Sequence, residues 1–210
     1  MPASTAAILE ALTRRGLLMK QDKRLPSVVT LIAGAPLASS WWSHAQSQRI
    51  FRVLCELADH PDVLLTKLLF AKDTLVHRAL WPALLTVATS AEHWQTDRLS
   101  PAARALLGRT RTARTQVVAS GVPVRELTSR LLVHAVEVHT PGGKHRVAVE
   151  PWSCWAARAG VLPLSSLVEA RGQLEAATAR FGAPLAALPW RTTRVARRGG
   201  KAEGKRAESD

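Results

Sequence analysis

Helix-ending residues divide the first sixty residues of this chain into short segments, and this feature constrains the fold more than any other. Gly16 and Gly34 each follow an amphipathic run, and Pro61 follows a third. Glycine readily ends a helix, and proline cannot continue one. We therefore predict three short helices, in STAAILEALTRRG, in RLPSVVTLIAG with Pro26 at its start, and from about Ala45 to Asp59.

A hairpin is predicted after these helices. The stretch DVLLTKLLFAKDTLVHR has a β-like composition on both sides of a polar turn at Lys72 and Asp73, and ALWPALLTVAT then returns to a helical pattern. Three helices followed by a two-stranded wing is the element order of a winged helix-turn-helix domain. The first half of the chain resembles such domains in element order, and the resemblance implies DNA binding by analogy of fold.

The second half repeats this order in a reduced form. Ser100 and Pro101 are typical of a helix start, and we expect that helix to run through PAARALLGRTRTARTQVV. A short helix in VRELTSRLL leads into a second hairpin, LVHAVEVHTPGGKHRVAVEPW, and two more helices follow. Each hairpin precedes a helix that contains tryptophan, which is a pattern that tandem winged-helix-like units would explain.

The predicted fold class is therefore α+β and mostly helical, with two winged-helix-like units that each end in a β-hairpin followed by a helix. The predicted parts are residues 1–95, residues 96–190 and a basic tail over residues 191–210. The tail has almost no apolar side chains, so we expect it to be disordered. The whole chain is 47% hydrophobic, which is enough for a buried core.

The charge of the chain indicates a polyanionic partner. The formal net charge is +13 and the isoelectric point is about 11.3. The tail holds seven basic and three acidic residues, which leaves 22 basic and 13 acidic residues in positions 1–190. The part expected to fold is thus basic without the tail, and nucleic acid leads the classes of partner that such a charge favours.

The strongest candidate for phosphate contact is the stretch from Arg98 to Arg125, which contains no acidic residue. Arg104 and Arg111 lie seven residues apart, two turns along one helical face, and nearby threonines supply hydroxyl donors. The alternative is an exposed helix whose arginines pair with acids elsewhere. With two arginines and one tryptophan from the first half, the predicted nucleic-acid contacts are Arg98, Arg104, Arg109, Arg111, Arg114, Arg49, Arg52 and Trp42.

Seven tryptophans and no tyrosine give the chain an unusual aromatic content. Trp81, Trp152 and Trp155 lie in apolar helical stretches, and we predict them in the core. In SSWWSHAQSQ, two adjacent tryptophans precede the third helix. One ring of this pair can anchor the helix start while the other faces outward, so packing and base stacking both stay open for this stretch.

The second hairpin holds the best candidates for metal binding or acid–base chemistry: His134, Glu137, His139 and His145. A three-residue loop over 141–143 would place His139 opposite His145, with Glu137 on the same face. A two- or four-residue loop would instead gather four valines on one face, where each contributes about 1.5 kcal/mol when buried. We therefore predict the valine register and no metal site.

Other catalytic patterns are missing from the sequence. It contains no G-x-S-x-G, no G-x-G-x-x-G and no Walker loop, and Ser43 beside His44 is not a dyad. Cys55 and Cys154 each stand alone in an apolar context, which predicts buried thiols. We expect no cofactor and favour a binding protein over an enzyme, with catalytic residues left unassigned.

The stretches SSWWSHAQSQRIF, TLVHRALWPALL and RLLVHAVEVHTPGGKH resemble an uncharacterised family of bacterial proteins, and the resemblance covers most of residues 20–190. It implies a discrete folded protein and carries over no catalytic residue. The sequence lacks an apolar run of membrane-spanning length, and its first residues do not resemble a secretory signal. The expected location is the bacterial cytoplasm, in association with the nucleoid.

We expect a nucleic-acid-binding protein that contacts double-stranded DNA and serves transcription, repair or nucleoid functions. One alternative is a nucleic-acid-processing enzyme whose site would include His44, Glu137, His139 or His145. The other is a protein-interaction module for an acidic partner. The sequence leaves open whether the chain forms a homo-oligomer.

Overall fold

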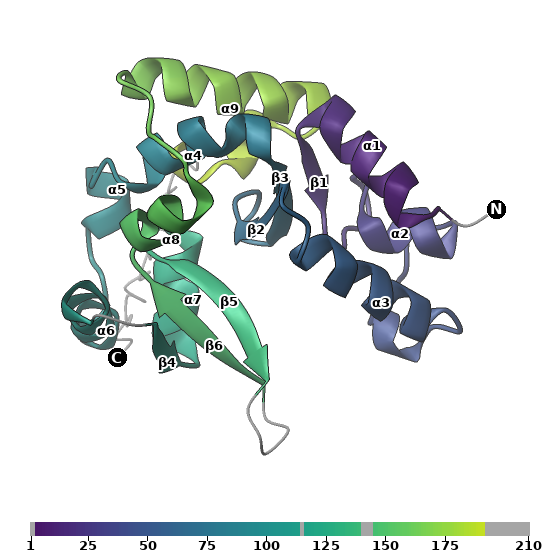
Figure 1. Ribbon diagram of the computed structural model, residues 1–210, viewed down its shortest axis with the longest axis horizontal. Coiled ribbons are helices and arrows are strands. Elements are labelled where there is room, and N and C mark those ends of the chain that lie inside the picture. The colour runs from purple at the N-terminus through teal and green to yellow at the C-terminus, as the bar shows by residue number, and fades with distance from the viewer. Residues whose placement is uncertain (1–2, 114–115, 140–144, 192–210) are drawn as a thin grey trace, which may run out of the picture.

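The structure is a computed structural model that describes residues 3–113, 116–139 and 145–191 (Figure 1). It contains helices and two three-stranded antiparallel sheets, which confirms the predicted α+β, mostly helical class. The predicted tail lies outside the described residues except for Arg191. That residue belongs to the folded part, because its guanidinium group donates hydrogen bonds to the carboxylate of Glu175.

Three helices begin the first unit: α1 (Thr5–Arg15), α2 (Val28–Ala33) and α3 (Ser47–Ala58). The Ser4 side chain accepts a hydrogen bond from the amide of Ala7, and Gly16 ends α1 in the left-handed region at φ 77°. The predicted helices are confirmed, although α2 starts later than predicted. Its N-cap is Ser27, so Pro26 lies just outside it.

The first sheet has the strand order β1–β3–β2, where β1 is Leu17–Met19, β2 is Val63–Lys67 and β3 is Asp73–His77. The predicted hairpin is confirmed, but its turn lies earlier than predicted. Phe70 and Ala71 both have φ 54° and make the turn, while Asp73 already begins β3. The sequence did not predict β1, because three residues are too few to show strand alternation.

The second sheet repeats the order as β4–β6–β5, with β4 at Val117–Ala119, β5 at His134–His139 and β6 at His145–Glu150. Before it stands α6 (Pro101–Thr112), and α7 (Val122–Ser129) joins β4 to β5. The prediction that the helix from Pro101 runs through QVV is wrong, because α6 ends at Thr112. Residues 117–119 pair with β6 instead.

Each hairpin is followed by a helix that begins with tryptophan: α4 (Trp81–Ala88), after the 3-10 turn η2 (Arg78–Leu80), and α8 (Trp152–Ala159). A short helix, α5 (His93–Thr96), leads to the second unit. The long helix α9 (Leu167–Phe181) lies along α4 and also contacts α1 and β1 (Figure 1). The 3-10 turns η3 (Leu185–Ala187) and η4 (Pro189–Arg191) end the described part.

The described residues form two hydrophobic cores. Trp152 and Trp155 of α8 and Leu174 and Phe181 of α9 are buried in the first core. The second core is made from a single stretch, by Leu99, Ala103, Leu106, Leu107, Val124, Leu127, Val133 and Val149. The second unit is thus inserted between two parts of the chain that build the first core.

The register of the second hairpin also differs from the prediction. His139 pairs with His145, and Val136 pairs with Ala148, so the valines of β5 and those of β6 belong to opposite faces. The predicted valine face does not form because β6 is the central strand and is covered on both sides. Val149 is buried in the second core on one side, and Glu150 is buried on the other.

Candidate functional site

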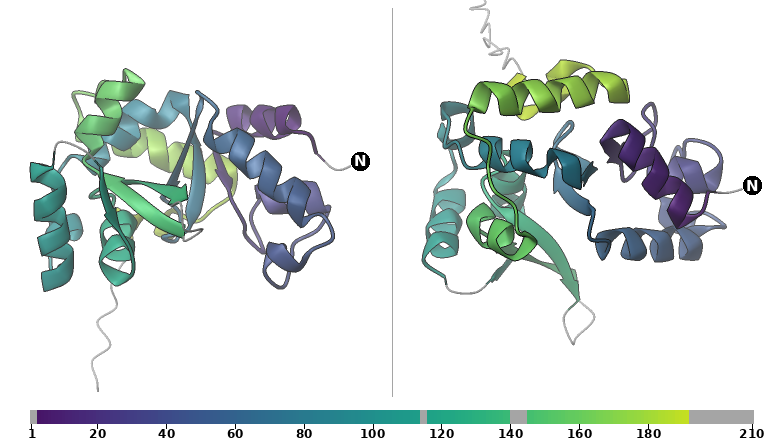
Figure 2. Two further views of the ribbon diagram at one scale, coloured as in Figure 1. Left: turned by 60° about the horizontal axis from the view of Figure 1, so that its bottom comes forward. Right: turned by 45° about the horizontal axis from the view of Figure 1, so that its top comes forward.

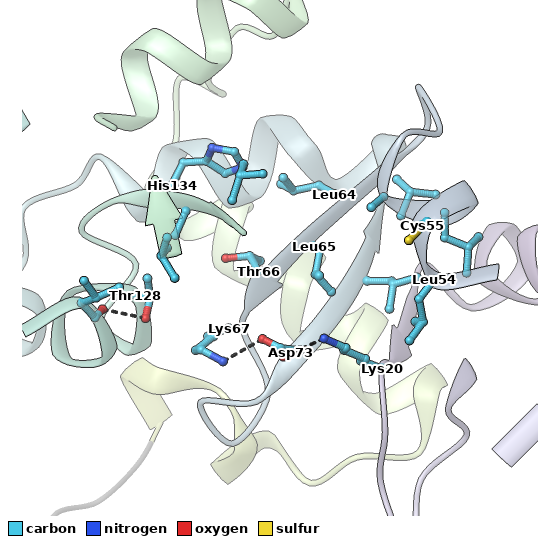
Figure 3. A pocket seen from close by; sticks show the side chains of 18 of the residues that line it. Lys20, Leu54, Cys55, Leu64, Leu65, Thr66, Lys67, Asp73, Thr128 and His134 are labelled. Atoms are coloured by element: carbon cyan, nitrogen blue, oxygen red, sulfur yellow. Dashed lines mark hydrogen bonds and ion pairs between the residues drawn. The ribbon is translucent and has the colours of Figure 1, made fainter. Parts of the chain in front are cut away.

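A cleft of about 970 Å³ lies between the two units (Figure 3). The β2–β3 hairpin forms one wall. To one side lies α3 with Leu54 and Cys55, and to the other lies α7 with Thr128. The strand β5 adds His134 and Val136 to the lining. Since β2 and β5 are both edge strands of their sheets, the cleft separates two sheet edges.

The amphipathic pattern of α3 supplies the apolar side of the cleft. One stripe of this helix, Ile50, Val53 and Leu57, is buried in the first core. The neighbouring stripe, which includes Phe51, Leu54 and Cys55, lines the cleft. The 3.6-residue repeat of a helix places these two stripes side by side. Phe51 keeps 41% of its surface exposed there.

Two stacked tryptophans stand before α3, in the 3-10 turn η1 (Trp41–Ser43), whose N-cap is Ser40. Trp41 is 6% exposed and Trp42 is 59% exposed. Their centroids are 3.9 Å apart with an interplanar angle of 26°, and Phe51 approaches Trp42 at 5.7 Å. One ring therefore packs inward and the other faces outward. Both line the cleft.

Charged side chains also line the cleft. The Lys67 ammonium group lies 2.7 Å from one carboxylate oxygen of Asp73, and the Lys20 ammonium group lies 3.7 Å from the other (Figure 3). Two cations thus share one anion. Arg125 and Arg146 are exposed lining residues for which the described part of the chain holds no ion-pair partner. The cleft wall is therefore positive overall.

A buried polar cluster lies beside the cleft, where the imidazole Nδ1 of His134 is 2.9 Å from a carboxylate oxygen of Glu150. Burial, which disfavours the imidazolium ion, lowers the pKa of His134, so the neutral ring donates its Nδ1 proton to the carboxylate. Burial opposes ionisation of Glu150, but hydrogen bonds from Arg158 and His134 outweigh it and lower the pKa of that carboxyl. The cluster links α8 to both strands of the second hairpin.

The predicted phosphate contacts on α6 are exposed. Arg104, Arg109 and Arg111 make no ion pair with any residue of the described ranges, while Ala103, Leu106, Leu107 and Thr110 hold the helix against the second core. Arg98 is exposed beside Asp97, with 3.5 Å between charged atoms. Arg114 lies outside the described residues.

The structure separates the predicted contacts into two groups. The helix α3 and the turn with Trp42 lie at one end of the molecule, and α6 lies at the other (Figure 1; Figure 2). On α3, Arg52 is exposed, whereas Arg49 donates a hydrogen bond to the carbonyl oxygen of Ala3. A single flat contact surface therefore cannot include both groups in this conformation.

The residues of the enzyme alternative are described only in part, and the hairpin has the register expected for a three-residue loop, with His139 opposite His145. Nδ1 of His44 accepts a hydrogen bond from the amide of Gln46, which is a turn contact. The backbone register also pairs Glu137 with Val147, and the side chains of Glu137, His139 and His145 lie outside what the structure describes. Within the described ranges, no group of three histidine, cysteine or acidic residues is arranged to hold a metal ion.

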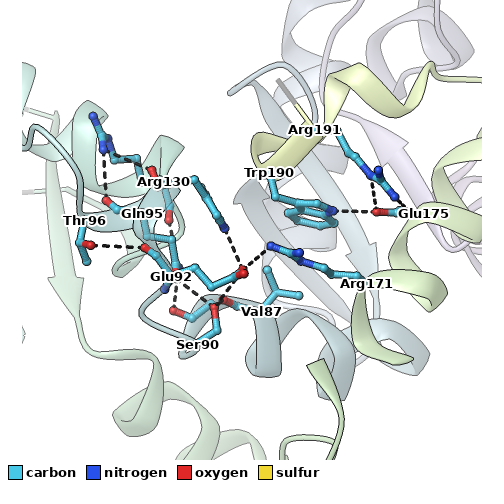
Figure 4. A network of polar contacts seen from close by, with 12 residues as sticks. Val87, Ser90, Glu92, Gln95, Thr96, Arg130, Arg171, Glu175, Trp190 and Arg191 are labelled. Atoms are coloured by element: carbon cyan, nitrogen blue, oxygen red, sulfur yellow. Dashed lines mark hydrogen bonds and ion pairs between the residues drawn. The ribbon is translucent and has the colours of Figure 1, made fainter. Parts of the chain in front are cut away.

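A polar network fixes the second unit to the first (Figure 4). The Gln95 side chain is buried and donates hydrogen bonds to the carbonyl oxygens of Ala88 and Arg130, at 3.1 and 3.3 Å. The Arg130 guanidinium group donates to carbonyl oxygens at the end of α5. Glu92 accepts from Trp94 and forms an ion pair with Arg171 of α9. The hydrogen bonds between Arg130 and the residues of α5 therefore join the second unit to the first.

Sequence reasoning missed the cleft because its lining comes from distant segments. Lys20 follows β1, and Arg146 belongs to a strand 126 residues later in the chain. Trp81, Trp152 and Trp155 are buried, as predicted. The cysteine prediction is wrong, since Cys55 and Cys154 are both exposed. The exposed stripe of α3 that carries Cys55 was the available signal, but its apolar composition also fits a core.

None of the helices in the described ranges combines the length and the apolar content needed to cross a membrane. Comparison with known proteins finds no relative of this chain. No family model, no curated protein and no solved structure matches the chain.

Proposed function

We propose that this protein binds nucleic acid, and duplex DNA in the first place, through the arginines of α6. The observation that carries the proposal is the outer face of this helix, where Arg104, Arg109 and Arg111 are exposed and form no ion pair within the described part of the chain. Guanidinium groups on a fixed helix match phosphate oxygens in geometry and charge.

The local fold supports this function. Ser100 caps α6 by accepting a hydrogen bond from the amide of Ala103, and the buried face anchors the helix. The arginines therefore stand on a rigid element, so that binding restricts their side chains but not the backbone that carries them. Neutralising phosphates releases counterions, so binding of this kind does not depend on base sequence and falls steeply with salt. A role in transcription, repair or nucleoid organisation would follow.

The proposal is tested with fluorescence anisotropy on duplex DNA over a salt series. We expect Arg111→Ala to weaken binding similarly on unrelated sequences and to lower the slope of log K against log salt by about one unit. Arg180→Ala, on the exposed side of α9, removes the same charge elsewhere and serves as the control. If both variants lost the same DNA affinity, the effect would be one of net charge. If Arg111→Ala left the DNA affinity unchanged, α6 would not be part of the interface.

The basic segment 192–210 needs its own control, because it carries six basic and three acidic residues. A version ending after Arg191 keeps the hydrogen bonds of Trp190 and Arg191 to Glu175, which an earlier truncation would break. We expect this version to retain the effect of Arg111→Ala. Loss of all DNA binding with the segment would contradict an interface on α6.

A further inference from the structure

The stack of Trp41 and Trp42 has one exposed member, which lies in the cleft. Trp41 covers one face of Trp42 at 3.9 Å, yet Trp42 remains 59% exposed inside the cleft. Phe51 and Val136, at 41% and 42% exposure, face the same space. An exposed indole at the end of a stack accepts a further flat ring, and nucleobases bind proteins in this way.

The charge of the cleft lining points to an anion. Five cationic and two acidic side chains belong to the described cleft lining. One of the cations, Arg158, is taken by Glu150, and Asp73 is shared by Lys20 and Lys67. Arg125 and Arg146 add positive charge that no described acid neutralises. A ligand that carries its own negative charge would complete this wall.

We propose that the cleft binds an aromatic phosphate of nucleotide size, with its ring stacked on Trp42 and its phosphate beside the basic side chains. The volume of about 970 Å³ lies at the upper end of the roughly 300–1,000 Å³ typical of ligand pockets. The inference does not rest on the proposed function, because no residue of α6 belongs to the described lining.

Two cysteines provide a direct test in the unmodified protein. Cys55 lines the cleft, Cys154 on α8 is outside the described lining, and both are exposed. The probe is adenosine 5′-monophosphate, and the readout is the rate of iodoacetamide alkylation at each thiol by mass spectrometry. At ten times the dissociation constant, we expect Cys55 to react roughly tenfold more slowly while Cys154 keeps its rate. Equal rates at Cys55 with and without saturating probe would overturn the proposal.

Matched ligands separate the two halves of the recognition. Adenosine has the ring without the phosphate, and ribose 5-phosphate has the phosphate without the ring. We expect the monophosphate to bind more tightly than either in calorimetric titration. If adenosine binds as tightly as the monophosphate, the anionic part of the proposal fails, and if ribose 5-phosphate does, the stacking part fails.

Matched variants assign the effect to residues. Trp42→Ala is expected to weaken binding of the monophosphate about tenfold, which is the effect of losing one stacked ring. Leu162→Ala removes another exposed apolar side chain, on a residue that is 81% exposed and not in the described lining, and should change nothing. Arg146→Ala should weaken the monophosphate and leave adenosine unaffected. A Trp42→Ala protein with unchanged affinity would refute the stacking role.

The source of the ligand is decided by comparing free nucleotide with a short single-stranded oligo(dA). Similar affinities assign the cleft to a free nucleotide, and much tighter oligonucleotide binding assigns it to an unpaired base within a strand. Arg111→Ala should leave nucleotide binding intact, so failure here is distinguishable from failure of the duplex-binding proposal. A dimer in light scattering that Trp42→Ala dissociates would give the cleft to a second copy and overturn the inference.

Discussion

The two units of this molecule share a strand order but differ in the helices that precede the hairpin. In the first, α2 and η1 stand between β1 and α3, whereas in the second β4 leads directly to α7. Four residues separate α3 from β2, and four separate α7 from β5, so α7 occupies the place of α3. The segment that the second unit lacks is the one that contributes Trp41 and Trp42 to the cleft.

The units also differ in how their cores are completed. The first core gains buried side chains from α8 and α9, while the second core uses only residues from its own stretch. A small core buries a small share of its surface and is marginal alone. The comparison teaches that the second unit depends on its attachment to the first, through α8 and the network around Gln95 and Arg130.

The largest expected effect comes from the two tryptophans that begin the helices after the hairpins. The indole Nε1 of Trp81 donates to the carbonyl oxygen of Val76, and that of Trp152 donates to the carbonyl oxygen of Leu131. We expect Trp81→Ala and Trp152→Ala each to lower the free energy of unfolding by about 3–5 kcal/mol, since each leaves a cavity and removes a buried hydrogen bond. Urea denaturation measures the loss.

Hydrogen exchange distinguishes the effects of these two substitutions. The Trp152 bond reaches Leu131, which is buried in the first core, so Trp152→Ala should remove protection from residues 97–150 in particular. Trp81→Ala should lower protection throughout the first core. If both variants gave the same exchange pattern, the two units would unfold as one and the contrast between them would fail.

An intermediate effect is expected where the hairpins differ most in polarity. The first residue of β2 and the last of β3 are Val63 and His77, whereas the matching pair in the second unit is His134 and Glu150. Glu150→Gln should lower the free energy of unfolding by about 1.5–3 kcal/mol at pH 7, the range for hydrogen bonds to a charged group. Glu10→Gln, an exposed pair partner of Arg14, is the control.

The pH dependence follows from the direction of both pKa shifts. Burial lowers the pKa of His134 in the folded protein. As the pH falls below about 6.5, the unfolded chain therefore binds a proton that the folded chain does not, and the free energy of unfolding decreases. The pKa of Glu150 is lowered although burial opposes this, because Arg158 and His134 donate to the carboxylate, so stability falls again below about 4.5. Glu150→Gln should flatten the second decline, and an unchanged acid profile would contradict the pairing.

The smallest expected effect is that of removing the N-cap serine from the first helix of each unit. Ser4 caps α1 and Ser100 caps α6, and each hydroxyl oxygen accepts a hydrogen bond from the amide three residues later, at 3.2 and 3.1 Å. Ser4→Ala and Ser100→Ala should each cost about 1 kcal/mol. Thermal unfolding checks the magnitude. A cost at Ser4 without one at Ser100 would mean that α6 is held by its buried face alone.

Local signals predicted the helices well, because caps and stops act on their own neighbours. Ser4, Gly16, Gly34 and the Ser100–Pro101 pair each mark a helix end that the structure contains. The strands β1 and β4 escaped prediction, since three residues acquire strand geometry only by pairing with a distant partner. The register of the second hairpin was mispredicted for a related reason. The prediction assumed that the hairpin buries one face only, whereas β6 is covered on both faces, so its valines need not share a face with those of β5.

The candidate site was predictable only in part. The arginines of α6 were visible in the sequence because they lie on one local element, and the outward tryptophan was visible as half of an adjacent pair. The cleft between β2 and β5 could not be predicted, because it depends on how two units are oriented. That orientation is set by contacts such as Gln95 with Arg130, 35 residues apart in the chain.

The return of α9 to the first unit affects how the chain folds during synthesis. The helix lies along α4 and contacts β1 and α1, so the first core is completed by residues translated long after its strands. Roughly a hundred residues separate α4 from the end of α9, which takes about 5–20 s at typical translation rates. For that time the nascent N-terminal unit presents an unfinished apolar surface, which favours aggregation until α9 has been made.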